Sequence, residues 1–224
     1  MPGPREHQPP AGLDFAVFAA DVERLAIGGM SEVWLAQAGG GPTVALKALL
    51  PHLSEDADVV RMFRQEGVVG SELLHRNLVR VLEHGCHSGR YWIAMELVEG
   101  RTLHQIHNEL RRKRRLPPIW FVAMTVSTIC SALHWAQTRL CGDGRFSSLV
   151  HRDVSPDNVM VSFEGVPKLL DFGIARINGR EVQASGVGTL KGKAAYMAPE
   201  QIQDPSNVGP EADVYSVGVV LYEL

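Results

Sequence analysis

The spacing of apolar residues divides the chain into a first part that predicts strands and a second part that predicts helices. Up to about residue 100, apolar residues come in short runs separated by turn-forming groups at 39–42 and 87–90, a pattern typical of strands. Residues 56–74 are the exception, because their apolar side chains recur every three or four positions, as in a helix. The predicted strands lie within residues 15–34, 43–47, 79–84 and 91–97.

After Gly100 the pattern is mainly helical. Strands followed by helices predict an α+β protein with two unlike lobes. We expect a disordered, Pro- and Gly-rich leader at 1–12, a first lobe at 13–97, a hinge at 98–100 and a second lobe at 101–224. The second lobe ends inside a helix that we expect to begin near Asp213.

Composition indicates an ordinary soluble protein. The chain has 224 residues, of which 45% are hydrophobic and 21% charged, values usual for globular proteins. The three cysteines lack CxxC spacing and no apolar run opens the chain, so we expect a reducing, cytoplasmic location without disulfides.

Two segments suggest other partners, and both have a simpler interpretation. Residues 111–115 are all basic, but the net charge is −3 and no aromatic residue interrupts the run. A solvated helix end or docking surface therefore explains it better than a nucleic-acid site. Residues 116–138 contain no charged side chain and are long enough to span a membrane. Their several Ser, Thr, His and Gln residues favour a buried core helix, so we expect no membrane segment.

Four short motifs follow one another in the second half: His-Arg-Asp ending at Asp153, then Asn158, Asp-Phe-Gly beginning at Asp171, and Ala-Pro-Glu ending at Glu200. Their order provides one carboxylate to accept a hydroxyl proton, and an amide and a second carboxylate to hold Mg²⁺. The segment between the last two motifs is left to receive a substrate. These are the parts of a phosphoryl-transfer site.

Two residues of the first half complete this set. Lys47 ends an apolar strand, and Glu66 lies on the helix predicted at 56–74. Each alone is typical of a solvated surface, but a lysine that contacts nucleotide phosphates needs a carboxylate to hold it. We therefore expect an ion pair, with Lys47 directed at nucleotide and not at the core.

Residues 26–33 lie between two predicted strands and are rich in small side chains. Such residues let backbone N–H groups approach phosphate oxygens. A plain hairpin with Gly28 and Gly29 at its tip has the same sequence, so both interpretations stay open.

With these motifs, residues 13–224 resemble the bacterial eukaryotic-like (Hanks-type) serine/threonine protein kinases. The resemblance implies that Asp153 is the catalytic base, that Asn158 and Asp171 bind Mg²⁺, and that Lys47 with Glu66 holds the phosphates of ATP. It also implies that Val33, Ala45 and Met160 sandwich the adenine, with Met95 as gatekeeper and 96–98 as hinge backbone. The implied nucleotide-binding set is Ala26, Ile27, Gly28, Gly29, Val33, Ala45, Lys47, Met95, Glu96, Val98 and Met160.

The resemblance further implies transfer of the γ-phosphoryl group to Ser or Thr hydroxyls of proteins, including this one. Ser185 and Thr189 are the expected autophosphorylation sites, with Arg152 available to pair with a phosphate there. Asp213 is expected to hold the backbone of the His-Arg-Asp motif from a buried helix.

The sequence departs from the family in several places. The pattern GxGxxGxV has Ala26 and Ser31 at its first and third glycines. Ser155 stands where the family has Lys, and Lys193 where it has Thr, so we interpret Lys193 as the catalytic cation delivered from the other side.

The family's last helices are absent from the sequence, so the resemblance implies that the second lobe, 101–224, is incomplete. We therefore expect exposed aliphatic side chains on the final helix and an unstable fragment. The alternative function is an inactive or scaffolding remnant that at most binds nucleotide. A small-molecule phosphotransferase fits less well, since such enzymes lack a long segment between Asp171 and Glu200. The side chains expected to be exposed are Val214, Val217, Val219, Val220 and Leu221.

Overall fold

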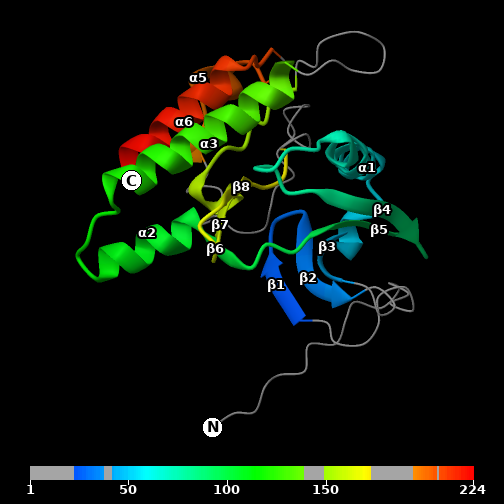
Figure 1. Cartoon of the computed structure of the whole chain (residues 1–224). Helices are drawn as coiled ribbons and strands as arrows, with labels where there is room; N and C mark the ends of the chain where they lie inside the picture. The colour runs from blue at the N-terminus through cyan, green and yellow to red at the C-terminus, as the bar shows by residue number, and fades with distance from the viewer. Residues whose placement is uncertain (1–22, 38–41, 139–148, 173–193, 206) are drawn as a thin grey trace. The chain divides into compact units, whose positions relative to one another are not determined.

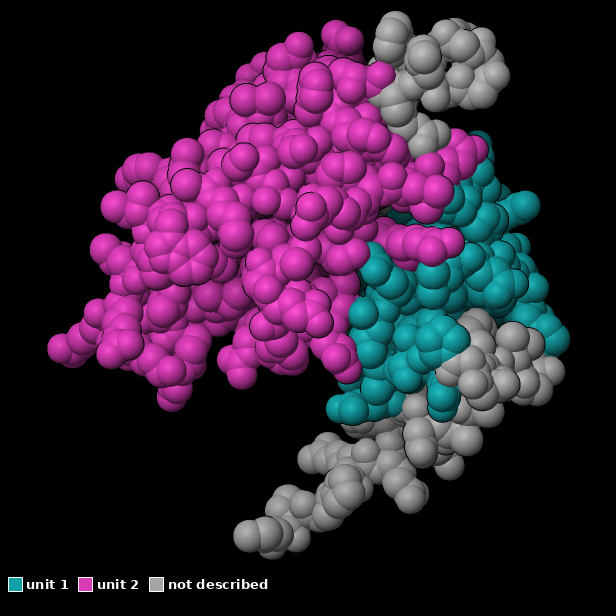
Figure 2. Space-filling model, viewed as in Figure 1, with its two compact units in different colours: residues 1–71, 81–97, 182–184 teal, residues 72–80, 98–181, 185–224 magenta. Residues whose placement is uncertain are grey.

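The computed structural model describes residues 23–37, 42–138, 149–172, 194–205 and 207–224. The chain forms two compact units (Figure 2). The first contains the described residues up to Ser71 together with Val81–Leu97, and the second contains Glu72–Arg80 and the described residues from Val98 onward. Each unit is described by itself.

The first unit is an antiparallel five-stranded sheet of order β1-β2-β3-β5-β4 with one helix. The strands expected at 43–47, 79–84 and 91–97 and the helix expected at 56–74 are confirmed. The part of the first predicted strand region before Glu23, the leader at 1–12 and the turn at 39–41 lie outside the described residues. The elements are β1 Glu23–Ile27, β2 Ser31–Gln37, β3 Thr43–Leu49, η1 Pro51–Leu53, α1 Ala57–Glu72, β4 Val81–His87 and β5 Arg90–Glu96.

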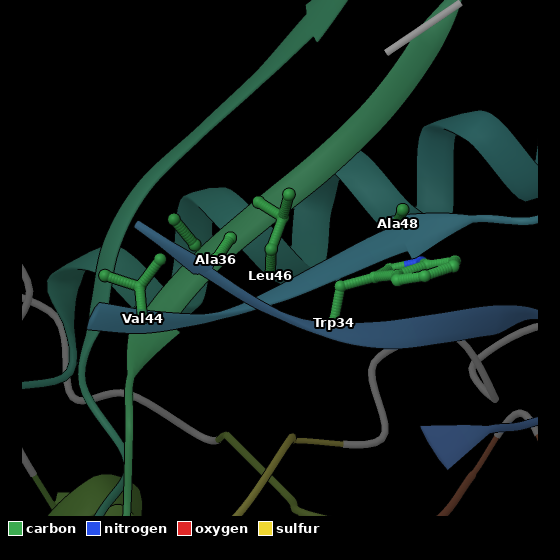
Figure 3. Packing of buried hydrophobic residues seen from close by; sticks show 6 residues of the cluster. Trp34, Ala36, Val44, Leu46 and Ala48 are labelled. Atoms are coloured by element: carbon green, nitrogen blue, oxygen red, sulfur yellow. The ribbon is translucent and has the colours of Figure 1, made fainter. Parts of the chain in front are cut away.

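Strand alternation gives this sheet two different faces. One face carries a buried apolar cluster around Trp34, Leu46 and Ala48 (Figure 3). Cross-strand partners share a face. The opposite face therefore carries Val33 opposite Lys47 and Leu35 opposite Ala45, and β5 supplies the partners of Lys47 and Ala45 on the other side of β3. Packing of the apolar face, at roughly 1.5–3 kcal/mol for each large side chain buried, fixes which residues the other face presents.

Helix α1 lies close against β4 through two glycines. A Cβ at Gly67 would lie 2.9 Å from His84, and one at Gly70 would lie 2.6 Å from a Val81 methyl carbon. Any larger residue would push the helix away from the sheet. This close approach sets the position of Glu66, which neighbours Gly67 on the buried side of α1.

The second unit is mainly helical with a small antiparallel sheet of order β6-β7-β8. A capping box between Thr102 and Gln105 begins α2 directly after β6. With the first unit, it confirms the α+β class. Its elements are β6 Gly100–Thr102, α2 Leu103–Arg112, α3 Ile119–Thr138, η2 Pro156–Asn158, β7 Val159–Ser162, β8 Pro167–Leu169, η4 Ala194–Tyr196, α5 Pro199–Gln203 and α6 Glu211–Glu223.

Among the described residues, α3 is the one helix whose length and composition would allow it to cross a membrane. Helix α6 lies beside α3 (Figure 1). Within α3, the residues Ile129, Ala132 and Ala136 are buried. Length and composition are met equally by core helices, and these buried positions make α3 part of the core of the second unit.

The expected exposure of α6 is right for some side chains and wrong for others. Val214 and Leu221 are 71% and 49% exposed, but Val217 is 6% exposed and Val220 fully buried. The buried pair lies on the same face as Asp213 and Ser216, on a helix that packs against α3. A helix presents only one stripe to its neighbour, so its valines cannot all have the same environment.

The environment of His75 indicates how the free energy of unfolding changes with pH. Its Nδ1 accepts a hydrogen bond from the Asn77 N–H at 3.2 Å, and its ring lies 5.3 Å from that of Trp135. Burial first, and the charge of Arg76 second, lower the pKa of His75 below 6.5. The folded state therefore prefers neutral His75, so its contribution to stability is present above pH 6.5 and lost as pH falls through the lowered pKa.

We expect His75→Asn, which keeps an acceptor atom near the Nδ1 position but cannot titrate, to lower the melting temperature at pH 7.5. The difference in melting temperature between this variant and the unmodified protein should become smaller as the pH is lowered to about 5.5, below the ordinary histidine pKa. Thermal unfolding followed by circular dichroism at both pH values measures this. A gap that stays constant with pH would contradict the prediction.

Candidate active site

The Lys47–Glu66 ion pair lies inside the first unit. Lys47 occupies β3 opposite Val33 of β2 and Ile93 of β5. Its ammonium donates to Glu66 Oε1 of α1, so the expected pair is confirmed. The expectation that Lys47 avoids the core is wrong, because only 6% of the residue is exposed. Residues Leu46 to Leu49 of β3 are all buried, and Glu66 of α1 lies against Lys47 on its face of the sheet.

Burial decides the electrostatics of this pair. Both side chains are 8% exposed, so each charge has lost most of its water. Such a loss is offset only by a well-placed opposite charge. The ammonium is thus held by Glu66 on the sheet face that also carries Val33 and Ala45, both of them partly exposed.

The segment 26–33 contains the end of β1, a tight turn at 28–30 and the start of β2. The Gly28 N–H donates to the Ser31 carbonyl at 2.8 Å, while Ala26 pairs with Val33 and Ile27 with Glu32 across the ladder. This geometry is a hairpin tip, and it agrees with both interpretations of the sequence. Through Val33, the turn continues onto the face of Lys47.

The backbone at residues 151–153 is held by a buried carboxylate. Asp213 of α6, 1% exposed, accepts from the His151 N–H and the Arg152 N–H, both at 2.9 Å. The role expected for Asp213 is confirmed. Arg152 has φ of 63°, a backbone conformation that residues other than glycine rarely adopt. The two hydrogen bonds to Asp213 therefore stabilise a strained turn.

His151 connects two parts of the site. Its fully buried ring lies 2.8 Å through Nε2 from the Leu170 carbonyl, and its Nδ1 accepts from the Asp153 N–H at 3.3 Å. Since a carbonyl only accepts and an N–H only donates, these partners assign the proton to Nε2. The ring also lies 4.7 Å from that of Phe172.

Asn158 brings the remaining groups together. Its Nδ2 donates to the Asp153 carbonyl at 2.7 Å and to Asp153 Oδ2 at 2.8 Å. The Asn158 backbone carbonyl accepts from the Leu170 N–H at 2.8 Å. The register of β7 and β8, with Val159 opposite Leu169, places Asn158 and the residue before Asp171 at the same end of the hairpin.

These donors fit a magnesium ion shared with a substrate. Both amide hydrogens of Asn158 are directed at Asp153, which leaves its amide oxygen for a cation, and Asp171 adds a carboxylate two residues after β8. In the part of the chain that the structure describes, no three His, Cys, Asp or Glu side chains lie close enough together to hold a metal ion by themselves. Mg²⁺ is usually bound by one or two side-chain oxygens with substrate phosphates and water completing its shell.

Three sequence expectations have a different or undescribed setting. Ser155 is 1% exposed, and its hydroxyl has no hydrogen-bond partner among the described residues. Lys193, Ser185 and Thr189 lie outside those residues. The Arg152 guanidinium, expected to meet a phosphate, donates instead to the carbonyls of Pro205 at 3.2 Å and Val208 at 3.3 Å.

Sequence reasoning missed two glutamines that support this loop. Gln201 of α5 donates to the Arg152 carbonyl at 2.9 Å and accepts from the Ala198 N–H at 3.0 Å. Gln137 of α3 donates to Asp213 at 3.1 Å. The only sequence signal was the place of Gln201 directly after Glu200. The first unit thus holds a buried ion pair, Lys47 with Glu66, and the second holds the partly buried Asp153 carboxylate against the Asn158 amide.

The chain is similar to known proteins over most of its length. The family described as the protein kinase domain matches residues 20–224. The tyrosine-protein kinase MasK of Myxococcus xanthus (strain DK1622) is 38% identical over 206 residues, covering 90% of this chain and 32% of that protein. The serine/threonine-protein kinase PknL of Mycobacterium tuberculosis (strain H37Rv) is 36% identical, covering 81% of this chain and 42% of that protein.

A solved structure shows the same fold. The crystal structure of the Mycobacterium tuberculosis PknI kinase domain matches with a TM-score of 0.71 and 30% identity, covering 97% of this chain and 77% of the crystallised chain. The chain spans less than half the length of the two curated relatives, 32% and 42%.

We predict strong energetic coupling between Lys47 and Glu66. Because both are buried, Lys47→Met or Glu66→Leu alone should destabilise the fold by about 3–5 kcal/mol, since each leaves a buried charge without its partner. The double variant should cost much less than the sum of the two. Denaturant unfolding of the four proteins gives the coupling energy.

The same helix offers a matched control. Arg61 and Asp58 form an exposed ion pair at 2.9 Å, and Arg61→Met should cost less than about 1 kcal/mol. Additive effects of the Lys47 and Glu66 substitutions would show that burial does not couple the two charges.

Proposed function

Because this chain belongs to the protein kinase family, in its bacterial Hanks-type group, we propose that it transfers the γ-phosphoryl group of ATP to Ser or Thr hydroxyls of proteins, itself included. Two hydrogen bonds carry the proposal. The Asn158 side-chain amide donates to the Asp153 carboxylate, and the Leu170 N–H, directly before Asp171, donates to the Asn158 backbone carbonyl. This arrangement supports the proposal, because it fixes the Asp153 carboxylate beside the Asn158 amide, which is the proposed metal ligand. ATP and protein substrates meet in the cytoplasm, where we place the domain.

Asp153 acts on the attacking group. The substrate hydroxyl oxygen forms a bond to the γ-phosphorus, the bond from that phosphorus to the oxygen of ADP breaks, and the hydroxyl proton passes to the Asp153 carboxylate. Asn158 donates to that carboxylate at Oδ2 and so fixes its direction. Fixing one oxygen reduces the freedom that must be lost at the moment of transfer.

Lys47 acts on the nucleotide. Its ammonium, oriented by Glu66, is proposed to contact the α- and β-phosphates. Val33 and Ala45 occupy the same sheet face as Lys47 and are proposed to sandwich the adenine with Met160 of β7. Met95, the partner of Ala45 in β5, is the proposed gatekeeper. The proposed backbone contacts come from Glu96 to Val98 at the base and from 26–29 at the phosphates.

The metal sites proposed are Asn158 and Asp171. When bound there, Mg²⁺ neutralises charge on the phosphate oxygens. The protein's own contribution is to keep the Asn158 amide oriented through Asp153 and to keep Asp171 beside it through the β7–β8 hairpin.

Tyrosine is the second candidate acceptor. PknL is named a serine/threonine kinase and MasK a tyrosine kinase, and the two are 36% and 38% identical to this chain. Serine and threonine are favoured because several further relatives are named for them, among them PknB of Mycobacterium leprae. A remnant that only binds nucleotide is disfavoured, since Lys47, Asp153, Asn158 and Asp171 are all present.

We expect this chain to label a generic protein substrate and itself with phosphate from ATP. Asp153→Asn should lower kcat by about 10²–10⁴-fold and leave ATP affinity unchanged. Glu164→Gln, an exposed carboxylate of the same unit, should have no effect. Phosphoamino acid analysis should find phosphoserine and phosphothreonine, and mass spectrometry should locate phosphate on Ser185 or Thr189.

The outcomes separate the candidates. Phosphotyrosine alone would establish the second acceptor. Binding of ATP with no transfer by the unmodified chain would favour the nucleotide-binding remnant. Equal rates for Asp153→Asn and the unmodified protein would remove the assignment of Asp153 as base.

Lys193 is proposed to supply the cation that Ser155 does not. The buried Ser155 hydroxyl without a described partner supports this, because that side chain is too short to reach a transferring group. Lys193→Thr should lower kcat by about 10²–10³-fold, the loss typical of one transition-state donor. Ser155→Lys in the same protein should restore part of the rate, and Lys113→Thr, at an exposed lysine, serves as control. An unchanged kcat for Lys193→Thr would refute the exchange.

A further inference from the structure

The connection between α2 and α3 combines positive charge with exposed apolar side chains. We call residues 111–120 the α2–α3 corner. Its five basic residues, 111–115, are all exposed. Directly after them, Leu116 is 86%, Ile119 88% and Trp120 67% exposed. Nothing in the proposed transfer of phosphate uses these side chains.

The positive charge of the corner is only partly compensated. Glu109 contacts Arg112 and Lys113, each at 2.9 Å. Hydrogen bonds from these two residues, Arg112 first, lower the pKa of Glu109 to about 2, so it stays ionised. Among the described residues, no ion pair engages Arg111, Arg114 or Arg115. Three guanidinium groups are therefore available to an anionic partner.

The corner has a defined backbone. Arg114 has φ of 53°, and the N–H groups of Arg114 and Arg115 donate to the carbonyls of Arg111 and Leu110, both at 2.9 Å. Pro117 and Pro118 follow and lead into α3, whose first turn presents Ile119 and Trp120. A left-handed residue and two prolines hold this turn in one shape. The exposed basic residues and the exposed apolar residues that follow them therefore need no folding step before they meet a partner.

This combination fits an anionic lipid surface. Guanidinium groups bind phosphate oxygens, clusters of basic residues are attracted to anionic lipids, and tryptophan with aliphatic side chains favours the interface between headgroups and acyl chains. An acidic protein segment would use the cations but would give no reason for three large apolar side chains beside them. We propose that the α2–α3 corner binds the surface of a bilayer that contains anionic phospholipids.

The test is sedimentation of the protein with vesicles of phosphatidylcholine, with and without phosphatidylglycerol. We expect binding only to the anionic vesicles, weakening as salt is added. The variant Arg111→Gln/Arg114→Gln/Arg115→Gln should bind about 10²-fold more weakly, at roughly fivefold for each cation near an anionic membrane. The matched control Arg64→Gln/Arg76→Gln/Arg101→Gln removes three exposed cations elsewhere and should bind as the unmodified protein does.

The apolar part is tested separately. Trp120→Ser should weaken binding several-fold, while Phe163→Ser, at an exposed ring (77%) of the β7–β8 turn, should not. Tryptophan fluorescence should shift to the blue on addition of anionic vesicles, and the shift should be lost in Trp120→Phe. Circular dichroism checks that each variant is folded.

Several results would overturn the proposal. They are no binding to anionic vesicles, equal binding to neutral ones, or equal losses in the corner variant and its control. Binding to polyglutamate as strong as to vesicles and insensitive to Trp120→Ser would assign the corner to an acidic protein instead. None of these results depends on whether the chain transfers phosphate.

Discussion

The geometry of the candidate catalytic loop depends on one buried carboxylate, that of Asp213. Its two oxygens accept the backbone N–H groups of His151 and Arg152, and this fixes Arg152 in a conformation that an ordinary residue avoids. A charge-assisted hydrogen bond in a buried setting is stronger than one in water. The strain at Arg152 is thus offset, and Asp153 leaves the turn in a set direction.

From that turn, order spreads through hydrogen bonds to neighbouring elements. His151 bonds to the carbonyl of Leu170, directly before Asp171. Asn158 donates to the Asp153 carboxylate, and Gln201 donates to the Arg152 carbonyl. The proposed base and metal ligands therefore belong to one network whose members restrict one another. Such mutual restriction is what pre-organises a site for phosphoryl transfer, where positioning and charge supply most of the catalysis.

The first unit reaches a similar end by another route. Its Lys47 and Glu66 are both largely withdrawn from water, so each needs the other. The approach of α1 to β4 through Gly67 and Gly70 makes the pairing possible. Each unit thus has a buried charged group with a hydrogen-bonding partner: Lys47 with Glu66 in the first, and Asp213 with two backbone N–H groups in the second. The basic residues of the α2–α3 corner are instead exposed to solvent, where they can bind another surface.

The sequence by itself determined the element types and the proposed chemistry. The change from short apolar runs to helical spacing predicted an α+β protein, and the motif order identified Asp153, Asn158, Asp171 and the Lys47–Glu66 pair. These are local signals, since periodicity depends on neighbours along the chain and each motif occupies a few consecutive residues.

Only the tertiary structure decided which side chains are buried and what they contact. Lys47 proved to be buried because Glu66 of α1 lies against it on its face of the sheet, and Val217 proved to be buried because α6 packs against α3. Gln201 and Arg152 are 49 residues apart along the chain, so no spacing rule could join them. Burial and long-range hydrogen bonds depend on which distant segments come together, and this is information that a single stretch of sequence does not contain.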